Sequence, residues 1–278
     1  MGKVWFITGC STGFGRELAK QVLANGEKAA VASRKTADVA DIIKDYPETA
    51  IAIQLDVTKA DEITAAVKQI TAKFERIDVL VNNAGIGYFG AIEESEEHEV
   101  RRMFDINFFG LANVTKAVLP ILRKQKSGMI VNIASIGGLV SFPTVGFYNA
   151  TKYAVDGFSE SLSKETAPLG IKVMVVAPSG FRTDWAGRSA NESPVVIEDY
   201  AATAGKNKGD IRGYSGKQPG DPVRAAKAII KAVEADEPPL RLLLGKAALK
   251  GARNKLELLK KDFDTWEEIT TGADFPEQ

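Results

Sequence analysis

Tyr148 and Lys152 lie four residues apart, so a helix would place both side chains on one face. Ser135 precedes Tyr148 by thirteen residues. Moving a hydride onto a carbonyl builds negative charge on its oxygen, and a positioned proton donor must neutralise that charge. A free tyrosine has a pKa of about 10, and a neighbouring ammonium group such as Lys152 would lower it. These residue types therefore suit carbonyl reduction or alcohol oxidation, with Tyr148 as general acid or base and Ser135 holding the substrate oxygen.

A glycine-rich turn, Thr8-Gly9-Cys10-Ser11-Thr12-Gly13-Phe14-Gly15, follows the first strand-like run and precedes a helical pattern. Glycines let the backbone turn tightly and approach a pyrophosphate, whose charge is stabilised at the N-terminus of the next helix. The alternative is a tight strand-to-helix turn without a ligand. Because the strand and helix flank the glycines as a dinucleotide site requires, we expect a nicotinamide cofactor here.

Three features together resemble the classical short-chain dehydrogenase/reductase family: the spacing Thr-Gly-x-x-x-Gly-x-Gly, the run Asn82-Asn83-Ala84-Gly85, and Asn107, Ser135, Tyr148 and Lys152 in this order. The likeness spans roughly residues 3–244, and the glycine turn is most similar to retinol and hydroxysteroid dehydrogenase-like members and to bacterial oxidoreductases. The resemblance implies that these four residues are catalytic. It also implies that Lys152 holds the nicotinamide ribose and that Asn107 supports a water-linked proton path.

The resemblance further implies a set of cofactor-binding residues near the ends of the strands. They are Gly9, Ser11, Thr12, Gly13, Phe14, Gly15, Arg34, Asp56, Val57, Asn83, Ala84, Gly85, Tyr148, Lys152, Pro178, Gly180 and Thr183. Asp56 has an equal alternative as a turn or helix-capping residue, and Asn82 is expected to brace the sheet. Ser179 departs from the family, which usually has Pro-Gly at this point. Either the backbone near the nicotinamide amide adjusts, or Gly180 takes the glycine role.

No acidic residue ends the second strand, where a carboxylate would bind the ribose 2′-hydroxyl of NAD and repel a 2′-phosphate. Arg34 follows that strand and can pair with the 2′-phosphate, while Ser11 can donate to it and Lys35 adds charge. We therefore expect NADP(H) to be preferred over NAD(H). The alternative is that Arg34 is a solvated loop residue.

Apolar runs that alternate with helical patterns predict the elements that position these residues. The predicted strands are Val4–Thr8, Ala29–Ser33, Ala50–Leu55, Val79–Asn82, Met129–Ile133, Lys172–Ala177 and Leu240–Leu244. Several runs are continuously apolar, as in parallel strands buried on both faces. Helical patterns include Phe14–Asn25, Asp61–Phe74 and a helix from Pro222 to about Glu234 that Asp221 caps. We predict a single α/β domain over residues 1–278, with a Rossmann-type, doubly wound, seven-stranded parallel sheet of order 3-2-1-4-5-6-7.

Two segments fall outside this alternation. Residues 181–220 show no clear strand character, and we expect a substrate lid there, with a surface insertion as the alternative. The tail over about 246–270 is predicted to be a helix with one apolar stripe, Leu249, Ala252, Leu256, Leu259, Phe263 and Trp266. Packing on its own domain is expected; subunit contact or closure of the pocket is the alternative. An apolar substrate wall is expected from Phe89, Phe142, Phe147 and Trp185, with plain core as the alternative.

The amino-acid composition limits the classes of binding partner that we expect. Thirty-six basic and 36 acidic residues cancel, which argues against nucleic acid or an anionic membrane as a partner. Without an apolar run of about 18 residues, we expect no membrane span. With one cysteine, Cys10, and one histidine, His98, we expect no disulfide, no metal and a cytoplasmic location. The expected partner is a small carbonyl or alcohol substrate, and family members generally form homodimers or homotetramers.

Two other functions stay open at this point. One is a non-catalytic NADP(H)-binding redox sensor, and the other is an epimerase or dehydratase of the extended branch of the same superfamily. The intact set of Ser135, Tyr148 and Lys152 counts against the sensor. The spacing of the glycine turn and the chain length count against the extended branch.

Overall fold

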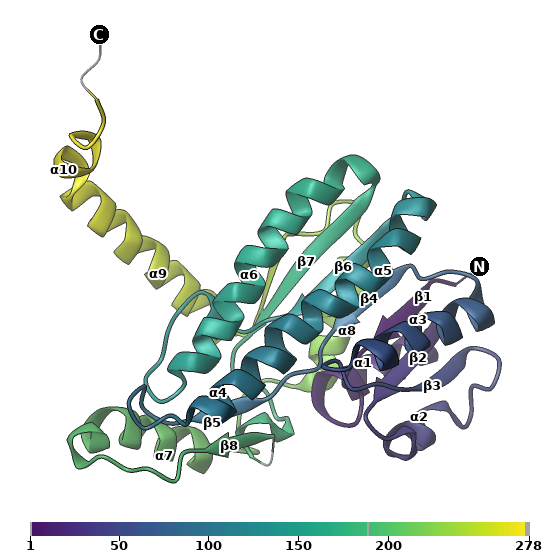
Figure 1. The fold of residues 1–278 in the computed structure, drawn as a ribbon, viewed down its shortest axis with the longest axis horizontal. Helices are drawn as coiled ribbons and strands as arrows, with labels where there is room; N and C mark the ends of the chain where they lie inside the picture. Colours follow the sequence, from purple (N-terminus) through teal and green to yellow (C-terminus); the bar gives the residue numbers. More distant parts are fainter. Residues whose placement is uncertain (1, 188, 276–278) are drawn as a thin grey trace.

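The computed structural model describes residues 2–187 and 189–275, and a seven-stranded parallel sheet forms its centre (Figure 1). Along the sheet the strands are β3 (Ala50–Gln54), β2 (Lys28–Ser33), β1 (Val4–Ile7), β4 (Val79–Asn82), β6 (Gly128–Ile133), β7 (Ile171–Pro178) and β9 (Arg241–Leu244). Numbered among themselves, these strands have the predicted order 3-2-1-4-5-6-7. Each predicted strand is found, with ends within one residue of the expected ones.

Helices cover both faces of the sheet (Figure 1). One face packs against α1 (Gly13–Ala24), α2 (Ala40–Ile43) and α8 (Pro222–Val233), the other against α3 (Ala60–Phe74), α5 (Leu111–Gln125) and α6 (Gly146–Thr166). Along β1, Trp5 and Ile7 enter the first core, whereas Val4 and Phe6 enter the second. Successive side chains of a strand point to opposite faces, so burial on both faces requires the continuous apolar run that the sequence shows.

A side-chain cap fixes where α8 begins. Asp221 Oδ1 accepts hydrogen bonds from the backbone N–H of Val223 (2.8 Å) and Arg224 (3.3 Å), which confirms the predicted cap of α8. Helix α4 (Glu97–Phe104) runs through a π-helical turn, η2 (Asp105–Gly110), into α5. Short turns of helix are η1 (Thr36–Val39), η3 (Ile136–Gly138), η4 (Ala167–Leu169), η5 (Asp184–Ala186), η6 (Glu198–Tyr200) and η7 (Ala201–Gly205).

The segment 181–220 contains more regular structure than expected. Strand β8 (Ala190–Glu192) pairs in parallel with β5 (Gly87–Phe89), and helix α7 (Lys206–Gly213) follows it. The expectation that this segment has no strand is therefore wrong at β8. A three-residue strand is too short to produce a recognisable apolar alternation, since its pairing depends on a partner more than 100 residues away in sequence.

The C-terminal tail forms α9 (Lys246–Thr265) and α10 (Glu267–Thr271). In its first turns Ala248 is buried and Gly251 lies beside Ile136, but beyond them α9 leaves the body of the molecule (Figure 1). The expectation that the whole apolar stripe packs on its own domain is therefore wrong, because α9 follows the edge strand β9 and points away from the sheet.

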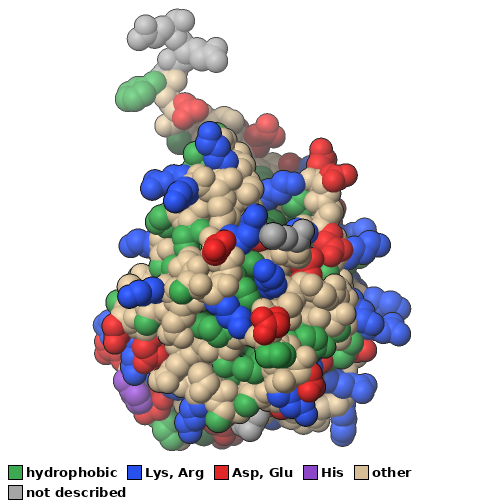
Figure 2. Space-filling model, turned by 90° about the vertical axis from the view of Figure 1, so that its right-hand side faces the viewer, with side chains coloured by type: hydrophobic (Ala, Val, Ile, Leu, Met, Phe, Trp, Pro, Cys, Tyr) green, Lys and Arg blue, Asp and Glu red, His purple; other side chains and the backbone are tan. Residues whose placement is uncertain are grey.

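Among the described residues, none of the helices combines the length and the apolar character that crossing a bilayer requires. On the face drawn in Figure 2, Lys and Arg side chains are interspersed with Asp and Glu. This mixture agrees with the balanced charge of the whole sequence.

Candidate active site

A cavity of about 1420 Å³ lies at the carboxyl ends of the central strands. Its lining includes the turns that follow β1, β2, β4, β6 and β7, which is where open α/β sheets bind their ligands. The lining holds the predicted catalytic and cofactor-binding residues except Gly15 and Asn107, as far as the described part of the chain shows. Residues as far apart in sequence as Gly9 and Thr183 thus border a single space.

The predicted catalytic side chains Ser135, Tyr148 and Lys152 come from two neighbouring elements. Tyr148 and Lys152 stand on successive turns at the start of α6, and Ser135 follows β6 as the cap of η3. Lys152 Nζ lies 5.6 Å from the centre of the Tyr148 ring and donates to the carbonyl oxygen of Ile133 at 2.9 Å. Ser135 Oγ accepts from the Gly137 N–H at 3.0 Å, and its hydroxyl is hydrogen-bonded to that of Tyr148. The three side chains therefore form one connected group at the cavity wall.

Burial dominates the ionisation of this group. Burial raises the pKa of Tyr148 to about 12, against the opposing effect of its hydrogen bond with Ser135. Burial also lowers the pKa of Lys152 to about 8. The expectation that Lys152 draws the pKa of Tyr148 below its usual value is thus not met in the protein alone. Tyr148 is held as a phenol near neutral pH, which is the form that a proton donor needs.

Asn107 stands behind the cavity wall, in the π-helical turn η2. Its Oδ1 accepts from the Ile86 N–H at 2.8 Å, and its Nδ2 donates to the Ile86 carbonyl (2.9 Å) and to Thr151 Oγ1 (3.2 Å). These bonds join the chain after β4 to α6, beside Lys152. A π-helical turn shifts the facing of the residues that follow it and is frequent at functional sites. No local sequence pattern marks the extra residue in this helical turn.

The glycine-rich turn has the geometry that a pyrophosphate needs. Gly9 and Gly13 have φ angles of +69° and +62°, which disfavour other residues. A Cβ at Gly9 would stand 2.8 Å from the Ala84 Cα, so the two backbones touch. Within the described chain the Thr12 side chain makes no capping hydrogen bond, and the first turn of α1 holds no acidic residue. The N-terminal N–H groups of α1 are therefore free to bind an anion, and a dinucleotide fits this turn.

Asn82 and Asn83 brace the strands around that turn. Asn82 Nδ2 donates to Thr115 Oγ1 and to Asn132 Oδ1, each at 2.9 Å, as the sequence predicted for a bracing residue. Asn83 also lines the cavity, and its Nδ2 donates to the carbonyl oxygens of Thr8 and Gly9. Its role in the structure is therefore to hold the glycine turn as well as to border the cofactor site.

The part of the cavity that borders the turns after β2 and β3 carries charged side chains. Burial raises the pKa of Asp56, but hydrogen bonds from Thr58 and the charges of Lys59 and Arg34 outweigh it, so its pKa lies below the usual value. Asp56 Oδ1 accepts from the Thr58 N–H and hydroxyl, which makes it a turn residue that also lines the cavity. Arg34 is exposed here, and Asp38 of η1, which the sequence reasoning missed, borders the same space.

The Pro178-Ser179-Gly180 run keeps its place at the cavity although serine replaces the usual glycine. Ser179 Oγ donates to the Leu244 carbonyl at 3.3 Å and packs against Gly245, where a Cβ would stand 2.4 Å from it. Gly245 also has a φ of +94°. Both this positive φ and the nearness of Ser179 favour glycine at the position. The serine is thus accommodated by a glycine 66 residues later, a compensation that no local motif reveals.

Apolar side chains line the part of the cavity beyond Tyr148. Trp185 lies 4.9 Å from Tyr148 between ring centres, and Phe142 also borders the space. Phe89 packs behind Trp185 at 5.6 Å and is fully buried, so the expected wall is right for Phe142 and Trp185 but not for Phe89 or Phe147. The sequence reasoning missed other lining residues of this end, namely Ile136, Val140, Val145, Ile211, Gln218, Ala247 and Gly251.

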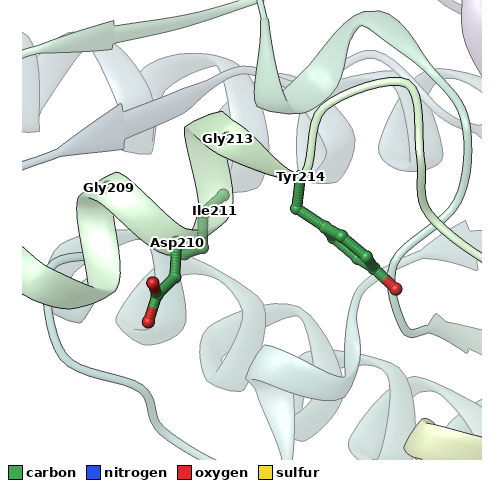
Figure 3. A pocket seen from close by; sticks show the side chains of 5 residues that line it. All are labelled: Gly209, Asp210, Ile211, Gly213 and Tyr214. Atoms are coloured by element: carbon green, nitrogen blue, oxygen red, sulfur yellow. The ribbon is translucent and has the colours of Figure 1, made fainter.

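A second hollow, of about 520 Å³, lies on α7 within the segment 181–220 (Figure 3). It is lined by Gly209, Asp210, Ile211, Gly213 and Tyr214. Asp210 is its one charged residue and is paired with Lys206 on the same helix. The residues that line this hollow do not form a catalytic group. Two of them, Ile211 and Tyr214, also border the large cavity.

Comparisons with known proteins agree with this geometry. Residues 3–193 match the family model described as short chain dehydrogenase. "Oxidoreductase BOA17" of Botryotinia fuckeliana is 39% identical over 98% of this chain and 100% of its own. "3-ketodihydrosphingosine reductase" of Bacteroides thetaiotaomicron is 37% identical over 87% of this chain and 88% of its own.

Solved structures show the same fold, and two of the following three have a nicotinamide cofactor bound. A short-chain dehydrogenase from Streptomyces avermitilis superimposes with a TM-score of 0.91 at 39% identity, over 99% of both chains. A Burkholderia phymatum family member in complex with NAD has a TM-score of 0.81 at 25% identity, covering 93% of this chain and 95% of its own. ElxO with NADP bound has a TM-score of 0.74 at 28% identity, covering 90% of this chain and all of its own. This chain is thus a member of the short-chain dehydrogenase/reductase family of oxidoreductases.

Proposed function

We propose that this protein interconverts a ketone or aldehyde and the corresponding alcohol, with NADP(H) preferred over NAD(H). The observation that carries the proposal is the connected group of Ser135, Tyr148 and Lys152 at the wall of a cavity that begins at the glycine turn. When bound, NADPH supplies the hydride that is added to the carbonyl carbon.

The residues of the chain would manage the proton and the substrate. Ser135 donates a hydrogen bond to the substrate oxygen and fixes its position. Tyr148 transfers its phenolic proton to that oxygen as negative charge builds up, so the product leaves as a neutral alcohol. Lys152 in its ammonium form stabilises the resulting tyrosinate and binds the nicotinamide ribose. In the oxidative direction the same tyrosinate accepts the proton of the alcohol.

The chemistry of the lining supports a lipophilic substrate. Ile136, Val140, Phe142 and Trp185 border the region beyond Tyr148. Residues 181–220, proposed as the substrate lid, contribute Trp185, Ile211 and Tyr214 to the same region. One relative is described as a 3-ketodihydrosphingosine reductase, which by its name acts on a ketone. A medium-sized apolar ketone is therefore the substrate class that we propose.

The test is NADPH oxidation with a panel of ketones and aldehydes, by the wild-type chain and by Tyr148→Phe. Removing the phenolic proton should lower kcat by about 100-fold or more while NADPH still binds. Tyr153→Phe is the matched control, because Tyr153 lies on the same helix but is half-exposed and outside the cavity. Equal turnover by both variants would overturn the role of Tyr148. Binding of NADPH without turnover on the whole panel would favour the redox-sensor function, and binding of neither nucleotide would sink the proposal.

A further inference from the structure

Helix α9 carries large apolar side chains that the body of this protein leaves exposed. The side chains of Leu256, Phe263 and Trp266 are 65%, 67% and 59% exposed. In Figure 1 this helix and α10 project away from the sheet. An amphipathic helix draws most of its stability from packing of its apolar face, and a contiguous exposed apolar surface marks an interaction site. The stripe therefore requires a partner that the described part of the chain does not supply.

The spacing of the stripe is that of a two-stranded coiled coil. Its members alternate at three and four residues, namely Leu249, Ala252, Leu256, Leu259, Phe263 and Trp266. In a coiled coil, these positions form the seam between two helices. Leu258 is also exposed, at 60%, but lies on a different face of α9. The apolar character is therefore concentrated on a surface shaped for a second helix.

The sizes of the side chains favour two copies of the same helix in opposite directions. If a two-fold axis passes between Leu256 and Leu259, each of these leucines faces the other in the second copy. In the same register Ala252 faces Phe263, so the smallest residue of the seam meets a large ring. Leu249 then faces Trp266. The smallest residue of the seam thus faces a large one, which is how facing layers fill space.

The charges along α9 and α10 favour the same direction. Residues 246–261 hold six cations and one carboxylate, the cations being Lys246, Lys250, Arg253, Lys255, Lys260 and Lys261. Residues 262–275 hold five carboxylates and no cation: Asp262, Asp264, Glu267, Glu268 and Asp274. Two antiparallel copies bring the basic half of one along the acidic half of the other. A parallel pair would set like charges side by side.

Charged positions that flank the seam within α9 divide into one favourable and one unfavourable pair. In the antiparallel register, Lys255 lies across from Asp262, twice by symmetry, whereas Glu267 lies beyond the break at Trp266 that ends α9. Arg253 lies across from Lys260, which is a like-charge pair. Asp264 is ion-paired with Lys260 within the same helix and offsets that repulsion.

We propose that α9 and α10 dock in antiparallel orientation on the same helices of a second copy of this chain, which makes a two-fold symmetric dimer interface. A lipid surface fits less well, because carboxylates flank Phe263 and Trp266 and would repel anionic headgroups. The pairing brings Trp266 of one copy beside Leu249 of the other. Leu249 lies between Ala247 and Gly251, which border the active-site cavity, so the interface is next to the site.

The first test compares Leu256→Asp with Leu258→Asp in the full chain by sedimentation equilibrium at micromolar concentration. Leu256→Asp puts a charge in the seam of both copies, and we expect the mass to halve and the dissociation constant to rise by about 100-fold or more. Leu258→Asp makes the same chemical change off the seam and should keep the wild-type mass. Equal masses for all three proteins, or the same loss in both variants, would overturn the proposal.

The second test measures direction. Ala252→Cys and Phe263→Cys are prepared separately, then mixed and oxidised, the native Cys10 being buried. In the antiparallel pair these positions face each other, so the mixture should give a disulfide-linked dimer that neither variant gives alone. Like positions are then 11 residues apart along the helix axis, or about 16 Å, which is too far for a disulfide. Cross-linking of each variant with itself would establish a parallel pair and overturn the register. A monomeric wild-type chain that binds phosphatidylserine vesicles through Leu256 would replace the second copy by lipid.

Discussion

The side-chain amide of Asn83 occupies the space beside Gly15. A Cβ at Gly15 would stand 2.4 Å from Asn83 Nδ2 and 2.7 Å from the carbonyl oxygen of Gly9. Asn83 Nδ2 donates to the carbonyl oxygens of Thr8 and Gly9 at 2.9 Å, and these bonds hold the turn. Gly15 therefore supports the glycine-rich turn without bordering the cavity, since its missing side chain lets Asn83 reach the backbone.

Gly15→Ala should weaken NADPH binding by about tenfold or more, because 1–3 kcal/mol is the usual effect of leaving a buried hydrogen-bonding group without its partner. The added methyl group has to displace Asn83 or the backbone of Gly9, and the melting temperature should fall as well. Gly157→Ala is the matched control, since no described residue lies within 4 Å of a Cβ there. Gly157 is inside α6, so this change should stabilise the protein by about 0.5–1 kcal/mol. Wild-type NADPH affinity in Gly15→Ala would contradict the bracing role of Asn83.

The sequence was sufficient for the sheet and for the turn because both depend on local patterns. Continuous apolar runs mark strands buried on both faces, and the glycine turn lies between the first strand and the first helix. Tyr148 and Lys152 needed only helical spacing. The parts that could not be predicted depend on distant contacts. The π-helical turn around Asn107 and the fit of Ser179 against Gly245 each involve residues that no single motif contains.

The C-terminal tail also shows what a sequence pattern cannot predict. The periodicity of α9 predicts an apolar stripe correctly, but it cannot say what covers the stripe. Only the direction in which the helix leaves β9 shows that the chain itself does not bury Phe263 and Trp266. A pattern in sequence therefore reports that a surface needs a partner, while the fold decides whether that partner is the same chain.

The buried Lys152 predicts the pH dependence of reduction. Its pKa is about 8, so Lys152 is an ammonium below that pH and loses its proton above it, while Tyr148 with a pKa of about 12 stays protonated throughout. The value of kcat/KM for NADPH, which reports the free enzyme, should be constant below about pH 7 and fall tenfold per unit above pH 8.

Lys152→Arg is the control for this profile, because a guanidinium group keeps its charge over the whole range. Its activity is expected to be lower, since arginine does not fit the buried position, but the fall near pH 8 should disappear. Persistence of the same fall in Lys152→Arg would assign the titration to another group.

Arg34 should determine the cofactor preference. It is exposed at the end of the cavity beyond β2 and can pair with a 2′-phosphate. Arg34→Ala is expected to lower kcat/KM for NADPH by about 10- to 100-fold, since a hydrogen bond to a charged group contributes about 1.5–3 kcal/mol, and to leave kcat/KM for NADH within about twofold. Both values come from steady-state rates at one carbonyl concentration.

Asp38 provides the comparison for Arg34, because it borders the same end of the cavity with the opposite charge. Asp38→Asn removes a carboxylate that would repel the 2′-phosphate, so NADPH use should stay the same or rise. A selective loss of NADH use in Asp38→Asn, together with an unchanged Arg34→Ala, would instead identify an NAD-preferring enzyme.

Glu94 should control how the lid segment meets the substrate. It is buried, and its carboxylate accepts from the backbone N–H of Ala91 (2.8 Å) and of Ile197 (2.9 Å). Its own carbonyl oxygen accepts from Ser193 Oγ, so one residue ties down the proposed lid around 193–197. Glu94→Ala leaves the N–H groups of Ala91 and Ile197 without that acceptor, at about 1–3 kcal/mol each. Part of the lid should then detach from the chain that follows β5.

We expect Glu94→Ala to raise KM for the carbonyl substrate by about tenfold with NADPH affinity unchanged, because the lid borders the substrate end and the glycine turn lies apart from Glu94. Glu93→Ala is the matched control. Glu93 also contacts the lid, through Tyr200, but the pair is exposed and should contribute little. Steady-state kinetics and limited proteolysis within residues 181–220 measure the two effects. Faster cleavage in Glu94→Ala alone, together with the higher KM, would show that Glu94 anchors the lid, whereas identical behaviour of the two variants would show that the lid is held elsewhere.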